Sequence, residues 1–155
     1  MIAGRTEGIE TVRSDGDNER VNRIMIPDLN SIEGWASGKP EIRLHVISSA
    51  LSTEIATQFF NPDRSVVKNQ QWWNLDEVGN LFPWYWADYG NFLIFHWIEE
   101  DSGATETTSY TSNGITYSIA KDSGDDDMGK KPVNKLDDIE THFNTGVIEW
   151  YSDAY

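Results

Sequence analysis

Two runs of acidic residues carry the side chains best suited to chemistry in this sequence. The first is Glu99-Glu100-Asp101, and the second lies in DSGDDD at residues 122–127. Glu99 and Asp101 follow an apolar run and are one residue apart, so in a strand both would leave the same face. Carboxylate oxygens are ligands that Ca²⁺ prefers. The pattern predicts a calcium site; the alternative is a set of solvated acids at strand ends.

A β-hairpin centred on Asn113-Gly114 is predicted to bring the two acidic runs together. An Asn-Gly pair supplies the two positive φ angles that a two-residue turn of this kind requires. The predicted register sets Ser112 opposite Ile115, Tyr110 opposite Tyr117, Thr108 opposite Ile119, and Glu106 opposite Lys121. Continued toward the base, the same ladder would set Asp101 opposite Asp126. Carboxylates that meet across a ladder repel, unless they turn to solvent or surround a cation.

The elements that would position these acids are mostly strands. Short runs of β-branched and aromatic residues alternate with Gly, Pro, Asn and Asp, as in strands joined by turns. The clearest runs are residues 24–26, 41–48, 91–100 and 147–152, and in the second of them Ile42, Leu44 and Val46 share one face. Residues 51–60 and 136–143 are each compatible with a short helix. We therefore predict an all-β fold, an antiparallel β-sandwich with an inserted hairpin around Asn113-Gly114.

Length and charge limit the organisation and the partners. The chain has 155 residues, enough for one domain with a sizeable core. Residues 1–20 are polar and predict a linker or flexible boundary, which leaves 21–155 as the folded domain. The 26 acidic against 12 basic residues give a net charge of −14, which repels nucleic acid. The sequence has no signal-peptide pattern and no apolar stretch long enough to span a membrane. The absence of cysteine and the high acidity fit an exported or surface domain, so we expect an extracellular or cell-surface domain.

Four short motifs resemble those of the C2 domain family, in the same order. Residues 26–46, IPDLNSIEGWASGKPEIRLHV, resemble the first strand, the acidic loop and the second strand of that family. WWNLDEVGNLF at 72–82 resembles the Trp-Asn-Glu-x-Phe region, and FLIFHWIEED at 92–101 resembles the strand that ends in Asp-x-Asp. DDDMG at 125–129 resembles the Asp-Asp-x-Ile-Gly end of the third loop. Together the motifs span roughly residues 24–130.

The resemblance implies a function and a set of ligands. C2 domains are β-sandwiches that bind calcium between loops at one end and contact membranes there. Carried onto this chain, the ligands would be Asp28 or Glu33, then Glu99, Asp101 and Asp127, with Asp126 as an addition. The implied partner is membrane lipid or another domain of a larger parent protein.

Aromatic residues suggest a second kind of binding module. Trp84 and Trp86 lie in a stretch rich in aromatic residues, and exposed rings of this kind stack on sugars. A carbohydrate-binding module with a Trp/Tyr platform is therefore an alternative, as is a structural accessory domain of a secreted or surface protein. Packing of these rings in the core is the ordinary explanation.

No catalytic motif is recognisable. The sequence contains no nucleophile elbow, phosphate-binding loop or dinucleotide fingerprint, so an enzyme is not expected. His45, His96 and His142 lie far apart and lack a zinc-binding spacing, which predicts packed or surface residues.

Overall fold

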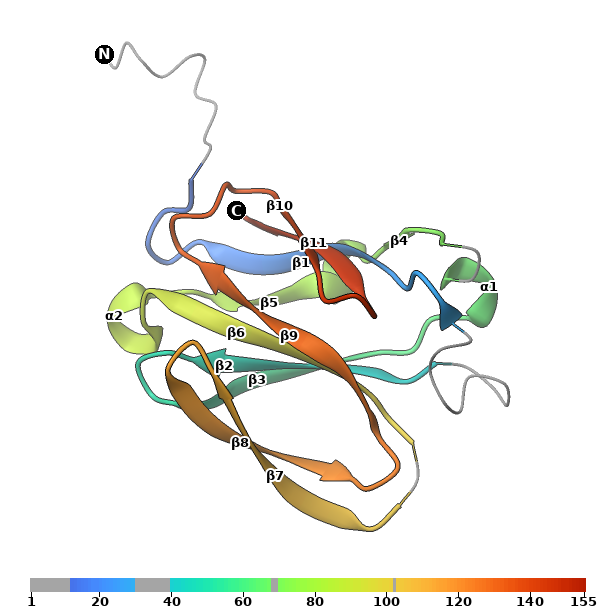
Figure 1. Ribbon diagram of the computed structural model, residues 1–155. Coiled ribbons are helices and arrows are strands. Elements are labelled where there is room, and N and C mark those ends of the chain that lie inside the picture. Colours follow the sequence, from blue (N-terminus) through green and yellow to red (C-terminus); the bar gives the residue numbers. More distant parts are fainter. Residues whose placement is uncertain (1–11, 30–39, 68–69, 102) are drawn as a thin grey trace, which may run out of the picture.

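The structure, a computed structural model, describes residues 12–29, 40–67, 70–101 and 103–155 (Figure 1). Strands dominate and pair antiparallel throughout the described part, which confirms the predicted all-β class. The elements are β1 (Asn18–Met25), β2 (Ile42–Ser48), β3 (Thr53–Phe60), α1 (Arg64–Val67), β4 (Trp73–Asn74), η4 (Asp76–Gly79), β5 (Asn80–Pro83), α2 (Trp86–Tyr89), β6 (Phe92–Glu99), β7 (Thr105–Ser112), β8 (Ile115–Asp122), β9 (Asp126–Asn134), β10 (Thr141–Asn144) and β11 (Glu149–Ala154).

The strands form three sheets. A five-stranded sheet has the order β10-β11-β1-β4, with β5 also paired to β1. A four-stranded sheet has the order β3-β2-β6-β9, and β7 pairs only with β8. In Figure 1 the five-stranded sheet lies above the four-stranded sheet, and the β7–β8 hairpin lies below both.

Residues from the two larger sheets form one buried cluster, the main core. The predicted apolar face of β2, Ile42, Leu44 and Val46, belongs to it. From β6 it receives Leu93, Phe95 and Trp97, and from the five-stranded sheet Val21, Ile24 and Trp150. Phe95 and Trp150 stack nearly parallel with ring centroids 6.1 Å apart. The two sheets therefore share their interior.

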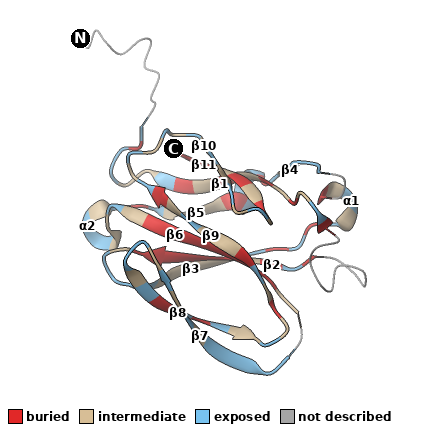
Figure 2. Ribbon diagram, in the orientation of Figure 1, coloured by how far each residue is buried: buried red, intermediate tan, exposed pale blue. Residues whose placement is uncertain are grey.

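Strand β6 is buried on both faces. Its burial pattern is continuous from Leu93 to Glu99 (Figure 2). Alternate residues face the main core, while Ile94 joins Ile47, Tyr117 and Ile119 in a second cluster under the hairpin. This explains why residues 92–99 form an almost unbroken apolar run instead of an alternating one, as in strands covered on both sides.

The hairpin has the predicted register. All four predicted pairs occur, from Ser112↔Ile115 to Glu106↔Lys121, and Asn113 has the positive φ of 51° that the turn requires. The ladder ends at Thr105↔Asp122, however, so it never reaches Asp101. Asp126 instead begins β9 and lies opposite Glu99 on β6. The predicted Asp101–Asp126 pairing is therefore wrong.

Three further predictions need correction: two short helices and the point at which the folded domain begins. Residues 53–60 form β3 and not a helix, because they pair along the whole edge of β2. Residues 136–143 form turns and the start of β10, again without a helix. β1 begins at Asn18, and Arg13 and Glu19 are buried and joined by two hydrogen bonds of 2.6 and 2.8 Å. The end of the predicted linker, residues 12–20, thus belongs to the fold.

The shared core predicts energetic coupling between the two larger sheets. Phe95→Leu and Trp150→Leu should each destabilise the fold, and together by less than the sum, with a coupling energy of about 0.5–1.5 kcal/mol for the stacked pair. Urea unfolding of the two single variants and the double variant measures this. Phe95→Leu with Ile119→Val, which lie in different clusters, is the control and should be additive. Additive effects for Phe95 and Trp150 would contradict the shared core.

Candidate functional site

The acidic end of the four-stranded sheet brings together only some of the predicted ligands. Glu99 ends β6 and faces Asp126 at the start of β9. Asp127, the next residue, accepts a hydrogen bond from His96 and is exposed. Asp28 is exposed after β1, and Glu33 lies outside the described residues. The predicted ligands therefore do not form one group. Asp126 and Asp127 are neighbours in β9, so their side chains leave opposite faces of the strand.

Asp125, which the sequence analysis did not select, organises this end of the sheet. It is buried, and its carboxylate accepts hydrogen bonds from Arg43 Nη2 (2.8 Å), Asp101 N (2.6 Å) and Asp122 N (3.0 Å). These bonds tie the loop after β6 to the loop before β9. An Asp three residues after another Asp in a Gly-bearing turn is the local signal for this role.

Glu99 is a buried acid with an unusual environment. Its side chain belongs to a residue that is 4% exposed, and Oε2 has no hydrogen-bond partner among the described residues. The pKa of Glu99 is raised to about 8, mainly by burial and further by the charges of Asp126, Asp101 and Asp125 and a hydrogen bond with Asp126. Glu99 therefore holds a proton at neutral pH.

A metal centre is not evident in the described part of the chain. Within residues 12–29, 40–67, 70–101 and 103–155, no three His, Asp or Glu side chains form a group that would hold a metal ion.

Among the described helices, none has the length and apolar character needed to cross a membrane.

The outer face of the five-stranded sheet carries a row of aromatic and cationic side chains. Tyr151 on β11 lies opposite His142 on β10 and Arg23 on β1. The His142 and Tyr151 rings stack 4.9 Å apart, and the Arg23 guanidinium lies 4.0 Å from the centre of the Tyr151 ring. Trp72 packs on this row, 5.1 Å from Tyr151, and keeps 36% of its surface exposed.

The same face has a polar part beside this row. Arg20 on β1 donates two hydrogen bonds to Asp153 on β11, of 2.8 and 2.7 Å, and Asn22 donates a third of 3.2 Å. Arg20, Asn22, Asn74 and Asp76 line a hollow of about 220 Å³. The exposed Tyr155 ring lies 4.9 Å from the Arg20 guanidinium. We call the whole surface, from Trp72 to Tyr155, the aromatic face.

The tryptophans singled out by sequence do not form this face. Trp84 is 1% exposed and belongs to the main core, where its Nε1 donates to Gly90 O at 3.0 Å. No face of this ring is open for stacking on a sugar. Trp86 is partly buried and packs against the same core, with the Lys135 ammonium 4.5 Å from its ring. Trp72 and Tyr151 were missed because their exposure depends on pairing between distant strands.

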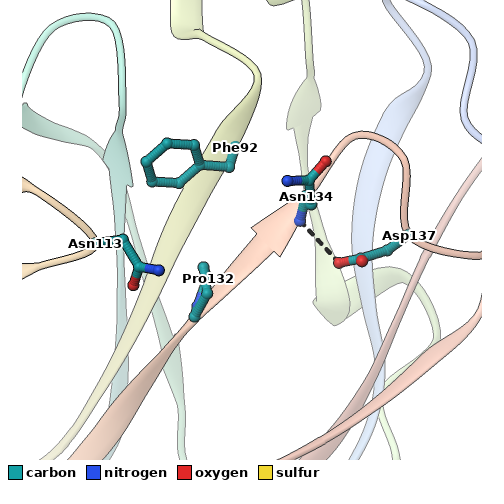
Figure 3. A pocket seen from close by; sticks show the side chains of 5 residues that line it. All are labelled: Phe92, Asn113, Pro132, Asn134 and Asp137. Carbon is teal, nitrogen blue, oxygen red and sulfur yellow. Dashed lines mark hydrogen bonds between the residues drawn. The ribbon is translucent and has the colours of Figure 1, made fainter.

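A second concave site lies at the tip of the hairpin. Phe92, Asn113, Pro132, Asn134 and Asp137 line a pocket of about 360 Å³ (Figure 3). Asn113 comes from the hairpin turn, while the other four belong to β6, β9 and the turn after it. The pocket exists only when the hairpin lies against the four-stranded sheet.

A hydrogen-bond chain centred on the buried His96 holds the hairpin in that position. His96 is fully buried, its Nδ1 lies 2.9 Å from Tyr117 Oη, and its Nε2 lies 2.9 Å from Asp127 Oδ1. Burial lowers the pKa of His96 more than Asp127 raises it, so the ring is neutral at pH 7. Neutral His96 accepts from Tyr117 and donates to Asp127. His45, the cross-strand neighbour of His96, is also buried and is bonded to Glu54, as expected for packed histidines.

Comparison with known proteins returns no match: neither a family model, nor a curated protein, nor a solved structure matches this chain. The resemblance to C2 domains therefore stays a prediction from the sequence motifs.

The buried Glu99 predicts a loss of stability at alkaline pH. Its folded-state pKa of about 8 lies above the usual 4.5, so the folded form binds the proton more tightly than the unfolded form. Stability from this group is present below about pH 4.5 and is lost as the pH rises through 8. Glu99→Gln should therefore stabilise the fold at pH 9 by roughly 1–3 kcal/mol and have little effect at pH 4.

Thermal melts across this pH range measure the effect. Glu106→Gln, an exposed acid on the hairpin, is the matched control and should change little at either pH. Equal stabilities of the parent protein and Glu99→Gln at pH 9 would show that Glu99 is not held protonated.

Proposed function

We propose that this chain is a non-catalytic binding module that recognises a neutral carbohydrate on its aromatic face. The observation that carries the proposal is Trp72, an exposed ring supported by Tyr151 and Arg23 beside a polar hollow. Aromatic rings supply large, rigid apolar contacts for the C–H faces of sugars. The Asn and Asp groups of the hollow can donate to and accept from hydroxyl groups.

The charges on the aromatic face favour a neutral ligand. Arg20 is bonded to Asp153, and His142 Nε2 lies 2.8 Å from Glu149 Oε1. The charge of Arg20 is therefore balanced by Asp153, so Arg20 offers little to a phosphate or a carboxylate, while the Arg23 guanidinium packs over the Tyr151 and Trp72 rings. The net charge of −14 further disfavours nucleic acid and anionic lipid as partners.

The dimensions of the face suit more than one sugar ring. Arg20 and Arg23 lie three positions apart on β1, and a strand rises about 3.3 Å per residue, so the polar and aromatic parts span roughly 10 Å. Tyr155 extends the face beyond Arg20. An open surface of this length is compatible with the interior of an oligosaccharide chain.

We also propose that the two larger sheets form a β-sandwich, with the C2-like arrangement that the sequence motifs imply. The shared core of Phe95, Trp97 and Trp150 supports the sandwich. Such a scaffold exposes the outer face of a sheet to ligands while its inner face remains dry.

Removal of the exposed ring should weaken binding. Trp72→Ala is expected to lower the affinity for a bound oligosaccharide at least tenfold, about 1.4 kcal/mol, because the stacking surface is lost. A glycan array identifies the ligand and titration calorimetry measures the change. Phe59→Ala, which removes an exposed aromatic ring from β3, is the control and should bind normally. If no glycan binds, or if Trp72→Ala binds as the parent does, the proposal fails.

A second candidate function is calcium-dependent contact with membrane lipid or with a parent protein, at the acidic end of the sheet. One observation favours it: Glu99 is buried beside Asp126 with Oε2 lacking a hydrogen-bond partner in the described part of the chain. A divalent cation would relieve the repulsion among these carboxylates by displacing the proton of Glu99. Calcium would also be needed to bridge an acidic surface to lipid phosphates.

Calcium binding of this kind would be linked to pH. Millimolar calcium should raise the melting temperature above that in EDTA, more at pH 8 than at pH 6, because Glu99 must lose its proton. Glu99→Gln should remove the calcium effect, and Glu106→Gln should preserve it. Equal melting temperatures in calcium and EDTA at pH 8 would exclude this function.

A further inference from the structure

We propose that the pocket at the hairpin tip binds a single ring of a neutral, hydroxylated ligand such as a monosaccharide, and that the bound ring holds the hairpin against the four-stranded sheet. The pocket of about 360 Å³ falls within the usual range for small-molecule sites, about 300–1,000 Å³. It lies apart from both the aromatic face and the acidic end.

The polar groups of the pocket have a fixed orientation. Asn113 Oδ1 accepts a hydrogen bond from Ser112 Oγ (2.9 Å), and Asn134 Oδ1 accepts one from Leu136 N (3.0 Å). With their oxygens engaged, both amides present their NH₂ groups as donors. Figure 3 shows the side-chain nitrogens of Asn113 and Asn134 turned toward the space between them.

The remaining lining residues complete a site for a sugar ring. Asp137 Oδ2 accepts from Asn134 N at 2.8 Å, which holds the carboxylate at the edge of the pocket as an acceptor. The Phe92 ring and Pro132 supply apolar surface (Figure 3). A hydroxylated ring satisfies this set, because each hydroxyl both accepts from an amide and donates to a carboxylate.

Other ligand classes fit the pocket less well. An ammonium group would satisfy Asp137 but would meet two NH₂ donors, which cannot accept its hydrogen bonds. An anion would satisfy the donors but would be repelled by Asp137 and by a chain of net charge −14. A purely apolar ligand would desolvate the two NH₂ groups without giving them acceptors.

The position of Asn113 links binding to the hairpin. Asn113 lies at the tip, while Asn134 and Asp137 belong to the body of the fold. A ligand that contacts both sides binds only the docked hairpin, so it stabilises that state by mass action. Ile115 and Phe92 pack against the second cluster next to the pocket, and the Tyr117–His96–Asp127 chain secures the same docking deeper in the interface.

The test uses saturation-transfer NMR with neutral monosaccharides: glucose, galactose, mannose and N-acetylglucosamine. Asn113→Gly removes the amide and keeps the turn, because glycine readily adopts the positive φ of 51° at this position. Phe92→Leu removes the aromatic ring from the pocket and keeps apolar bulk. We expect one or more sugars to bind the parent protein, and both variants to weaken that binding at least tenfold.

Two controls separate this site from others. Ser109→Ala changes an exposed hydroxyl on the same hairpin and should bind normally. The ligand class is that of the proposed function, but the site is different. In a Trp72→Ala background, which removes the main ring of the aromatic face, Asn113→Gly should therefore still weaken the remaining monosaccharide binding at least tenfold. The proposal is overturned if no monosaccharide binds, if Asn113→Gly binds as the parent does, or if Asn113→Gly makes no difference in the Trp72→Ala background.

Hydrogen exchange tests the link to the hairpin. A saturating monosaccharide should slow amide exchange in Thr105–Ser112 and Ile115–Asp122 of the parent protein, and should have no such effect in Asn113→Gly. Unchanged exchange in the parent protein at saturation would overturn the proposed closure.

Discussion

The burial of β6 on both faces is the constraint on which the rest of the structure depends. One face contributes Leu93, Phe95 and Trp97 to the main core, and the other supports the hairpin. A strand in this position requires a cover on each side, because an apolar outer face would otherwise be exposed to water. The five-stranded sheet provides one cover and the β7–β8 hairpin provides the other.

Two-sided burial also determines what happens to polar residues on β6. His96 and Glu99 lie inside the molecule, where an uncompensated charge is costly. These two residues avoid an uncompensated buried charge in different ways. His96 is neutral and bonded at both nitrogens, while Glu99 retains a proton among other carboxylates. The first arrangement fastens the hairpin, and the second leaves an acidic end whose charge depends on pH.

Local sequence chemistry predicted the hairpin and its register, because Asn113-Gly114 alone determines the turn. Long-range contacts decided the rest. The Asp125 carboxylate accepts hydrogen bonds from the backbone amides of Asp101 and Asp122, and the hairpin ladder ends before it reaches the predicted Asp101–Asp126 pair. Sequence spacing shows that acids are close along the chain but not which carboxylate is buried.

The choice between buried and exposed tryptophans was likewise beyond the sequence. Trp84 and Trp72 both have aromatic neighbours in the sequence, yet Trp84 is buried in the main core and Trp72 packs on the Tyr151 ring at the surface. That difference arises from the pairing of β1 with β11 and β4, which no local pattern encodes. For the same reason, segment 12–20 looked like a linker although Glu19 and Arg13 are buried together.

The pairing of β1 with β11 has a consequence for folding kinetics. Arg20 and Asp153, bonded side by side on the aromatic face, are 133 residues apart in the chain. Contacts of such high sequence separation form slowly, since a long loop must close first, whereas the β7–β8 hairpin is local and closes quickly. During synthesis the strand that carries Tyr151 and Asp153 emerges long after its partner. The edge of β1 that pairs with β11 therefore stays unpaired until then, and in that interval the nascent chain is most open to aggregation and to chaperones.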